Sequence, residues 1–286
     1  MKAARHTGPV AHAARLFLLA ALLARAGALS SQDTGTVHDT PYVPSPRATV
    51  SEMLRLAGAG PTDTVYDLGS GDGRVVIAAA KEFGARAVGV EIDPKLVAQS
   101  RAAATRAGVA DQVRFLQQDL FATDLAEASV VTLYLAPNLN LKLRPALLRL
   151  RPGTRIVAHG ADLGDWRPDR KTSIRKDVFL WIVPAQVAGR WRASVGAASR
   201  ARSLEIEFAQ RYQELSGRAW LEGVPAQVWE ARLSAERLSF VIVDAVDRED
   251  EAGLYFEGRV SGGTIEGTVT RGAGSGRSVQ HWRAIK

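Results

Sequence analysis

The sequence predicts an α/β protein, in which a doubly wound, Rossmann-like parallel sheet is followed by a smaller antiparallel β domain. From residue 48, short apolar strands alternate with helical patterns, which is typical of parallel sheets with right-handed crossovers. From about Gly189 the helical patterns stop, and short segments of alternating apolar and polar residues follow. The chain has 286 residues, 46% of them apolar and 23% charged, which suits two globular domains.

Residues 1–28 have the parts of a secretory leader. Lys2, Arg5 and Arg15 precede the apolar run Leu16–Ala24, and small residues follow this run. The run is much shorter than the roughly 20 residues that span a bilayer. We therefore expect an exported protein of the periplasm or envelope, held at a membrane only if the leader stays uncleaved. The alternatives are a mitochondrial import signal and a cytoplasmic enzyme translated from a later start.

Charge and cysteine content exclude several classes of function. The net charge is +7, but four basic residues precede the first acidic residue, Asp33. The rest of the chain has 33 basic and 30 acidic residues, which leaves +3 and predicts no nucleic-acid partner. The chain has no cysteine, which excludes disulfides, thiolate metal sites and a cysteine nucleophile. The oligomeric state stays open.

The first domain is expected over residues 48–187, after a polar, proline-containing linker at 29–47. Its predicted strands are Thr64–Leu68, Ala87–Glu91, Val113–Leu116, Ser129–Leu135 and Gly153–Ala158. Its predicted helices are Thr49–Leu56, Arg74–Phe83, Pro94–Arg106 and Leu141–Leu150. Two further strands, at 171–174 and 178–183, are expected to close the sheet as an antiparallel pair.

Three features converge on the carboxyl edge of this sheet, where doubly wound folds bind ligands. A glycine-rich turn at 69–73 follows the first strand, and its glycines let a ligand approach the backbone. Glu91 ends the second strand and suits the two hydroxyls of a ribose. Asp119 follows the third strand and suits the exocyclic amine of adenine.

The details of the turn favour one ligand. A dinucleotide fingerprint needs a small residue where Arg74 stands, and no phosphate-binding Gly-Lys-Ser/Thr ending is present. Asp67, directly before the turn, repels a phosphate and suits a ligand with an ammonium group. S-adenosylmethionine has an ammonium, a ribose and an adenine but no phosphate, so we expect it as the cofactor.

The string DLGSGDGR at 67–74, with Glu91 and Asp119, resembles the class I S-adenosylmethionine-dependent methyltransferases over about residues 42–186. PYVPSP at 41–46, YLAP at 134–137 and the stretch 143–160 resemble a subgroup with bacterial members and the mitochondrial lysine methyltransferases that act on the ATP synthase c-subunit and on the adenine nucleotide carrier. The Dot1-like enzymes are more distantly similar. The resemblance implies that Glu91 holds the ribose and Asp119 the adenine. It also implies a methionine site made by Asp67, Gly69, Ser70, Gly71 and Gly73.

The acceptor is less well defined than the cofactor. The Asn-Pro-Pro-Tyr motif of many amine methyltransferases is absent after the fourth strand, where Tyr134-Leu135-Ala136-Pro137 stands. Tyr134 and Asn138, at the end of that strand, and His159, at the end of the fifth, are the candidates to line an acceptor channel. Core packing for Tyr134 and a local cap for His159 are the structural alternatives. Trp166 is expected to pack in the core.

The second domain, residues 188–286, is expected to be a meander, sandwich or small barrel of short strands. Gly262-Gly263 predicts a two-residue hairpin turn. Four tryptophans of this domain are expected to fill its core rather than line a ligand cavity: Trp191, Trp220, Trp229 and Trp282. No histidine pair has metal-ligand spacing.

Three functions remain in competition. The subgroup resemblance implies a protein N-methyltransferase, directed at lysine, that works by direct in-line methyl transfer. A small-molecule acceptor is the first alternative, because the β domain is equally suited to gate a small pocket. The second is an exported, non-catalytic binding module that keeps the fold, because S-adenosylmethionine is not expected to be plentiful outside the cytosol.

Overall fold

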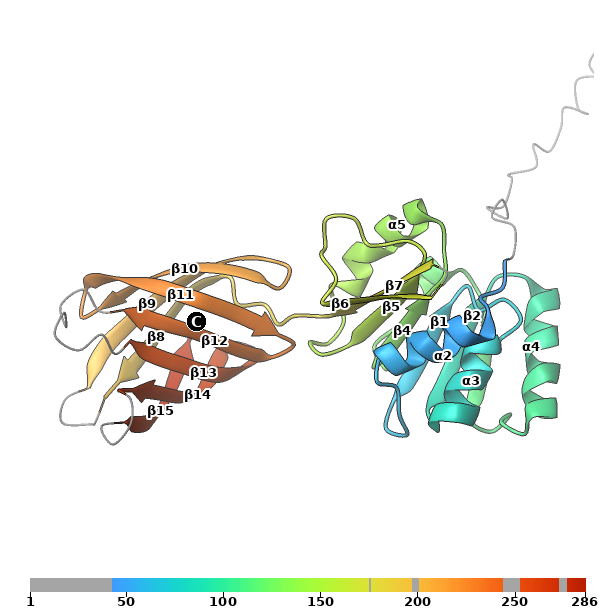
Figure 1. Cartoon of the computed structure of the whole chain (residues 1–286), viewed down its shortest axis with the longest axis horizontal. Helices are drawn as coiled ribbons and strands as arrows, with labels where there is room; N and C mark the ends of the chain where they lie inside the picture. Colours follow the sequence, from blue (N-terminus) through green and yellow to red (C-terminus); the bar gives the residue numbers. More distant parts are fainter. Residues whose placement is uncertain (1–42, 175, 197–200, 244–252, 273–276) are drawn as a thin grey trace, which may run out of the picture. The chain divides into compact units, whose positions relative to one another are not determined.

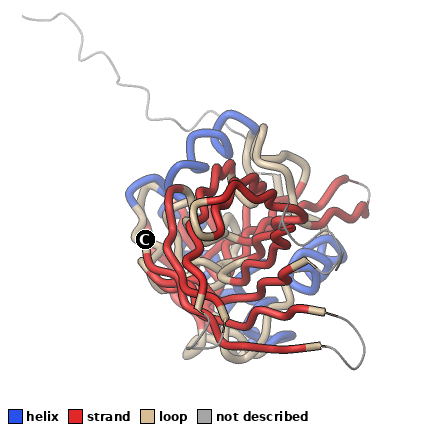
Figure 2. Tube along the Cα trace, turned by 90° about the vertical axis from the view of Figure 1, so that its left-hand side faces the viewer, coloured by secondary structure: helices blue, strands red, loops and turns tan. Residues whose placement is uncertain are grey.

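A computed structural model describes residues 43–174, 176–196, 201–243, 253–272 and 277–286 (Figure 1). The expected leader and all but the last residues of the expected linker lie outside this range. The described residues form two β structures, a seven-stranded sheet and a closed eight-stranded barrel. All the described helices precede the sixth strand in the sequence, and the described residues from 170 on form strands and loops. Figure 2 distinguishes the helices, in blue, from the strands, in red.

The sheet has the strand order β3-β2-β1-β4-β5-β7-β6. Its strands are β1 Thr64–Leu68, β2 Arg86–Glu91, β3 Val113–Gln117, β4 Val130–Leu133, β5 Arg155–His159, β6 Arg170–Ile174 and β7 Lys176–Ile182. The first five are parallel, and β7 is antiparallel to both β5 and β6. The order reverses between β1 and β4. This sheet confirms the predicted fold class, with the antiparallel pair at its edge.

Apolar side chains of successive strand residues alternate between two buried layers. One layer joins Val65, Val130 and Val157 to the helices α2 (Arg47–Leu56), α3 (Arg74–Phe83) and α4 (Pro94–Ala107). The other joins Leu68 and Leu133 to α5 (Pro137–Leu147) and to the loop with Trp166, which is fully buried as expected. Both faces of the sheet are therefore covered, so polar groups gather where the strands begin and end.

Two predicted boundaries around the fourth strand are wrong. Strand β4 ends at Leu133, and α5 begins at Pro137, four residues before the expected start. Proline at the first position of a helix has its φ angle preset and lacks only an N–H that would have no partner there. Asn138 consequently lies exposed in the first turn of α5 rather than at a strand end.

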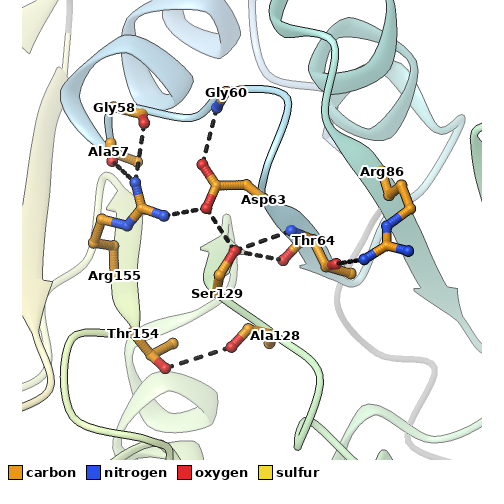
Figure 3. A network of polar contacts seen from close by, with 10 residues as sticks. All are labelled: Ala57, Gly58, Gly60, Asp63, Thr64, Arg86, Ala128, Ser129, Thr154 and Arg155. Atoms are coloured by element: carbon orange, nitrogen blue, oxygen red, sulfur yellow. Dashed lines mark hydrogen bonds and ion pairs between the residues drawn. The ribbon is translucent and has the colours of Figure 1, made fainter.

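A polar network ties together the amino ends of β1, β4 and β5 (Figure 3). Asp63 forms an ion pair with Arg155, and it accepts hydrogen bonds from the Gly60 amide at 2.9 Å and the Ser129 hydroxyl at 2.7 Å. Arg155 also donates to the carbonyls of Ala57 and Gly58, directly after α2. The charges of Asp63 and Arg155 therefore compensate each other within the chain.

The eight barrel strands are antiparallel throughout and confirm the predicted β domain, with closure into a barrel as the outcome. They are β8 Gly189–Val195, β9 Arg202–Arg211, β10 Glu214–Leu221, β11 Val224–Ser234, β12 Arg237–Val243, β13 Leu254–Ser261, β14 Thr264–Arg271 and β15 Ser278–Ile285. The expected hairpin turn at 262–263 joins β13 to β14. Within the described residues, no helix is long and apolar enough to cross a membrane.

The barrel core combines aliphatic side chains with a cluster of aromatic rings. Phe240 stacks on Phe256 with ring centroids 4.7 Å apart, and Trp282 packs edge-on against both. Trp191 is also fully buried. Trp229 contradicts the expectation of a core tryptophan, because its side chain is 55% exposed. Trp220 is only half-buried, with the Arg190 guanidinium over its ring.

Candidate cofactor and acceptor site

The glycine turn after β1 depends on backbone angles that other residues rarely adopt. Gly69, Gly71 and Gly73 have φ angles of 79°, 54° and 78°. The amides of Gly69 and Ser70 both donate to the Val90 carbonyl at 2.9 Å, which anchors the turn to β2. A Cβ atom on Gly73 would lie 2.8 Å from the Phe115 ring. The sequence therefore fixes a tight backbone turn at the carboxyl end of β1, in which Gly69 is exposed and Gly71 and Gly73 are buried.

Glu91 is held in place at the end of β2 by three backbone amides. Its Oε2 accepts from Gly71 at 2.9 Å, and its Oε1 accepts from Ile92 at 2.8 Å and Asp93 at 3.0 Å. Each carboxylate oxygen accepts about two hydrogen bonds, so Oε2 retains one acceptor position. The carboxylate is thus oriented and still able to accept from a ligand hydroxyl.

Asp119 lies two residues beyond β3 and caps the short 3₁₀ helix η1 (Leu120–Ala122). Its Oδ1 accepts from the Phe121 amide at 2.9 Å, which orients the carboxylate at the same edge as Glu91. One carboxylate oxygen is left for a donor such as an adenine amine. The proposed adenine contact stays a prediction.

Asp67 is a buried carboxyl group in β1. The Thr132 hydroxyl of β4 donates to its Oδ1 at 2.5 Å. Burial raises the pKa of Asp67 to about 7, although the Thr132 hydrogen bond opposes this rise, and the nearby charges of Glu91 and Asp72 add to it. A cation beside Asp67 would favour its ionised form, so the site is prepared for a ligand ammonium.

Three carboxyl groups at this edge, Asp67, Glu91 and Asp119, form no ion pair with any described cation. Asp72, in the same turn, is paired with Arg74 at 2.6 Å. A sheet edge whose carboxyl groups have no paired cation suits a cationic ligand. S-adenosylmethionine, with its ammonium and sulfonium charges, therefore fits the residues that are present.

Ser70 differs from the other predicted cofactor residues. Its hydroxyl lies against Gly89, whose added Cβ would stand 2.7 Å away, and it makes no hydrogen bond among the described residues. We expect the backbone of Ser70, rather than its hydroxyl, to serve the turn.

On the other side of β1, the structure brings Tyr134 and His159 together. Their rings stack with centroids 4.2 Å apart and planes inclined by 27°. Leu135 connects this pair to the glycine turn, because its Cδ2 would be 2.9 Å from a Cβ on Gly69. His159 is 3% exposed. Burial, followed by the positive charge of Lys176, lowers its pKa.

Two neighbours of this ring pair were not anticipated from the sequence. Ser45, in the segment before α2, places its hydroxyl 3.3 Å from Nδ1 of His159. The Ser45 carbonyl accepts from the Arg74 guanidinium at 2.8 Å, which ties this segment to the glycine turn. The second neighbour is Lys176, the first residue of β7, whose Nζ lies 3.4 Å from the Tyr134 hydroxyl.

The remaining sequence predictions have simpler outcomes. Asn138 is exposed, and its role in the acceptor channel stays a prediction. No group of three or more potential metal ligands gathers among the described residues.

A doubly wound sheet with this glycine turn after β1, and carboxylates after β2 and β3, defines the class I methyltransferases. Residues 67–170 match the profile of the ANTKMT methyltransferase domain. The chain is 42% identical over 154 residues to a protein-lysine N-methyltransferase of Saccharolobus islandicus, and the match covers 51% of this chain and 96% of that protein. The chain belongs to this family of S-adenosylmethionine-dependent methyltransferases.

Two further relatives frame the question of the acceptor. The mouse lysine N-methyltransferase of the ATP synthase C-subunit is 40% identical over 150 residues, and the match spans 51% of this chain and 59% of that protein. A solved structure described as an RNA methyltransferase from Salinibacter ruber, in complex with S-adenosyl-L-homocysteine, is 54% identical. It covers 51% of this chain and 96% of its own, with a TM-score of 0.50.

Proposed function

We propose that the protein is a protein-lysine N-methyltransferase that transfers a methyl group directly from S-adenosylmethionine to a lysine amine. The observation that carries the proposal is the stacked Tyr134–His159 pair beside the glycine turn, in a chain 42% identical to a protein-lysine N-methyltransferase across nearly all of that relative. The partly exposed Tyr134 ring, backed by the buried His159 ring, offers an apolar wall for a lysine side chain, next to the place expected for the methionine end of the cofactor.

The chain's own residues supply binding and orientation. Asp67 would hold the ligand ammonium, Glu91 a ribose hydroxyl and Asp119 the adenine. The bound cofactor supplies an electrophilic methyl group, so the protein's part in catalysis is chiefly to align an acceptor with it. A lysine has a reference pKa near 10.4 and must become neutral to accept a methyl group. Desolvation against the ring pair favours the neutral amine.

RNA is the second candidate acceptor, because the relative of 54% identity is described as an RNA methyltransferase. The charge of the chain supports protein rather than RNA. Beyond the first 32 residues basic and acidic residues nearly balance, and the candidate site is rich in carboxyl groups, which repel phosphates.

Isotope labelling distinguishes these acceptors. The purified protein is incubated with methyl-labelled S-adenosylmethionine and a cell extract, and labelled macromolecules are hydrolysed to amino acids and nucleosides. We expect label in methyl-lysine with the wild type, and much less of it with the E91A variant when S-adenosylmethionine is supplied below saturation. Label in nucleosides, or only in small molecules, would overturn the proposal. A folded protein that binds S-adenosylhomocysteine but labels nothing would indicate a non-catalytic binding module.

We also propose that the protein acts outside the cytosol, on the basis of the leader-like residues 1–28. Mass spectrometry of the native N-terminus tests this proposal. A terminus near residue 28 supports export, whereas a terminus near residue 37 would indicate a later start and a cytoplasmic enzyme.

A further inference from the structure

Lys176 reaches the candidate site because of the direction of its strand. Strand β7 is antiparallel to β5, with Val178 opposite His159, so β7 begins at the edge where the parallel strands end. The Gly160 amide donates to the Asp177 carbonyl at 2.8 Å and fixes this beginning of β7 to the end of β5. The antiparallel strand thus delivers a basic side chain to the acceptor side of the sheet edge.

The side chain of Lys176 has defined contacts there. Its Nζ lies 3.4 Å from the Tyr134 hydroxyl and 5.7 Å from the centre of the Tyr134 ring. A Cβ added to Gly160 would lie 3.6 Å from both Lys176 Cδ and Tyr134 Cε2. Gly160, with a φ angle of 82°, therefore leaves the space in which the lysine stem and the tyrosine ring come together.

The charge of Lys176 is not neutralised by any ion pair in the described part of the chain. Its neighbour in sequence, Asp177, is engaged by Lys171 at 2.8 Å and by the Ser173 hydroxyl at 2.6 Å. The titratable groups that face Lys176 are Tyr134, directly after β4, and His159, at the end of β5. A cation without a counter-ion thus borders the stacked ring pair.

We propose that Lys176 is a positioning residue whose ammonium destabilises the charged form of the acceptor lysine in the site and so favours the neutral amine. This inference rests on the proposed lysine methyltransferase function. A like charge nearby disfavours a second ammonium, in addition to the desolvation that the ring pair provides. The exposure of Lys176 to solvent limits the size of the effect.

The methyl-transfer step shows where this cation acts. The acceptor ammonium first releases a proton to water, and the lone pair of the neutral amine then forms a bond to the methyl carbon. The carbon–sulfur bond breaks, and its electron pair stays on sulfur as a thioether. The methylated nitrogen is again a cation, so Lys176 also favours departure of the product. The cation disfavours bound ammonium before and after the reaction.

The first experiment measures how the charge of Lys176 affects the titration of His159, and it needs neither substrate nor turnover. His159 is titrated by NMR in the wild type and in the K176M, K176R and K81M variants, with its signal assigned through H159Q. We expect the pKa of His159 to rise in K176M and to stay unchanged in K176R. Lys81 is exposed in the last turn of α3, so K81M removes a lysine charge elsewhere in the domain, serves as the control and leaves the titration unchanged. An unchanged titration in K176M would overturn the inference.

The second experiment uses a purified acceptor protein identified by the labelling experiment. In K176M, the pH profile of kcat is expected to move upward by about half a unit to one unit, because the bound ammonium is less destabilised. For the same reason KM at pH 7 is expected to fall by about threefold to tenfold. K176R and K81M retain the wild-type profile.

The outcomes separate the two proposals. An active wild type whose K176M variant keeps both its pH profile and its KM removes the role of Lys176 alone. A wild type that binds cofactor but methylates no lysine removes the proposed function, and this inference with it.

Discussion

Both edges of the parallel sheet carry carboxyl groups, but the two edges differ in whether these groups are paired with a cation. At the amino edge, Asp63 is paired with Arg155 and hydrogen-bonded to Ser129 and a backbone amide, so its charge is compensated within the chain (Figure 3). At the carboxyl edge, Asp67 and Glu91 have hydrogen bonds but no paired cation among the described residues. The first arrangement stabilises a fold, whereas the second leaves negative potential for a ligand.

The acceptor side of the carboxyl edge also carries a charge that is unpaired among the described residues, but there the charge is positive. Lys176 is a cation without a described counter-ion, beside the stacked Tyr134–His159 pair. The edge thus combines carboxyl groups around the expected cofactor with a cation at the expected acceptor. Charged side chains without a paired counter-ion therefore indicate the candidate site more specifically than charged side chains in general. Four predictions test this comparison.

The largest expected effect concerns Asp67 and pH. Its pKa is about 7 in the folded protein and near 3.8 in an unfolded chain. Between these values the unfolded chain has released a proton that the native protein keeps, so the free energy of unfolding falls as pH rises. Relative to the wild type, D67N should therefore gain roughly 2–4 kcal/mol between pH 4 and pH 8. Urea denaturation at several pH values measures this gain, and a difference independent of pH would contradict the assignment.

The amino edge should respond in stability alone. R155M leaves the buried Asp63 carboxylate without its cation, which should lower the free energy of unfolding by about 2–3 kcal/mol. The dissociation constant of S-adenosylhomocysteine should stay unchanged in the folded fraction. Chemical denaturation and calorimetry measure the two quantities, and weakened binding in R155M would break the functional distinction between the edges.

Glu91 should show the reverse behaviour. E91A removes a charged acceptor from the expected ribose position, which should weaken binding of S-adenosylhomocysteine by about 1–3 kcal/mol. The variant also loses hydrogen bonds to the Gly71, Ile92 and Asp93 amides, so its fold must be verified by circular dichroism. E91Q keeps an acceptor oxygen and should lose less affinity. Equal affinities for wild type and E91A would remove Glu91 from the site.

The smallest effect is expected at Asp119. D119A should weaken binding of S-adenosylhomocysteine by about 1 kcal/mol, because one hydrogen bond to adenine is lost. D119N keeps an oxygen that can accept from the Phe121 amide or from the adenine amine, so it should lose less affinity than D119A. Isothermal titration measures both variants. A loss in D119N as large as that in D119A would show that the charge matters rather than the hydrogen bond.

The sequence predicted those parts of the site that are set by single strands and their ends. The glycine turn follows β1 directly, and Glu91 and Asp119 stand at the ends of the next two strands, so the parallel topology alone places them together. Ser45 and Lys176 escaped prediction because their contacts join residues 114 and 42 positions apart. The position of Ser45 depends on the path of the segment before α2 along the carboxyl edge of the sheet. The position of Lys176 depends on the direction of β7.

The barrel shows a second limit of sequence reasoning. Alternating strands predicted the domain, but the inward or outward direction of each tryptophan depends on strand register. Trp282 points into the core, whereas Trp229 is exposed beside a β-bulge that shifts the register between Trp229 and Arg232. A bulge leaves little trace in the hydrophobic pattern, so the two residues look alike in the sequence.

Calorimetric titration of S-adenosylhomocysteine into the wild-type protein tests the central claim most directly, because it asks whether the carboxyl edge of the sheet binds the cofactor. We expect saturable one-to-one binding at micromolar strength that tightens as pH rises toward 7, where Asp67 ionises. The absence of binding by a demonstrably folded protein would contradict the account.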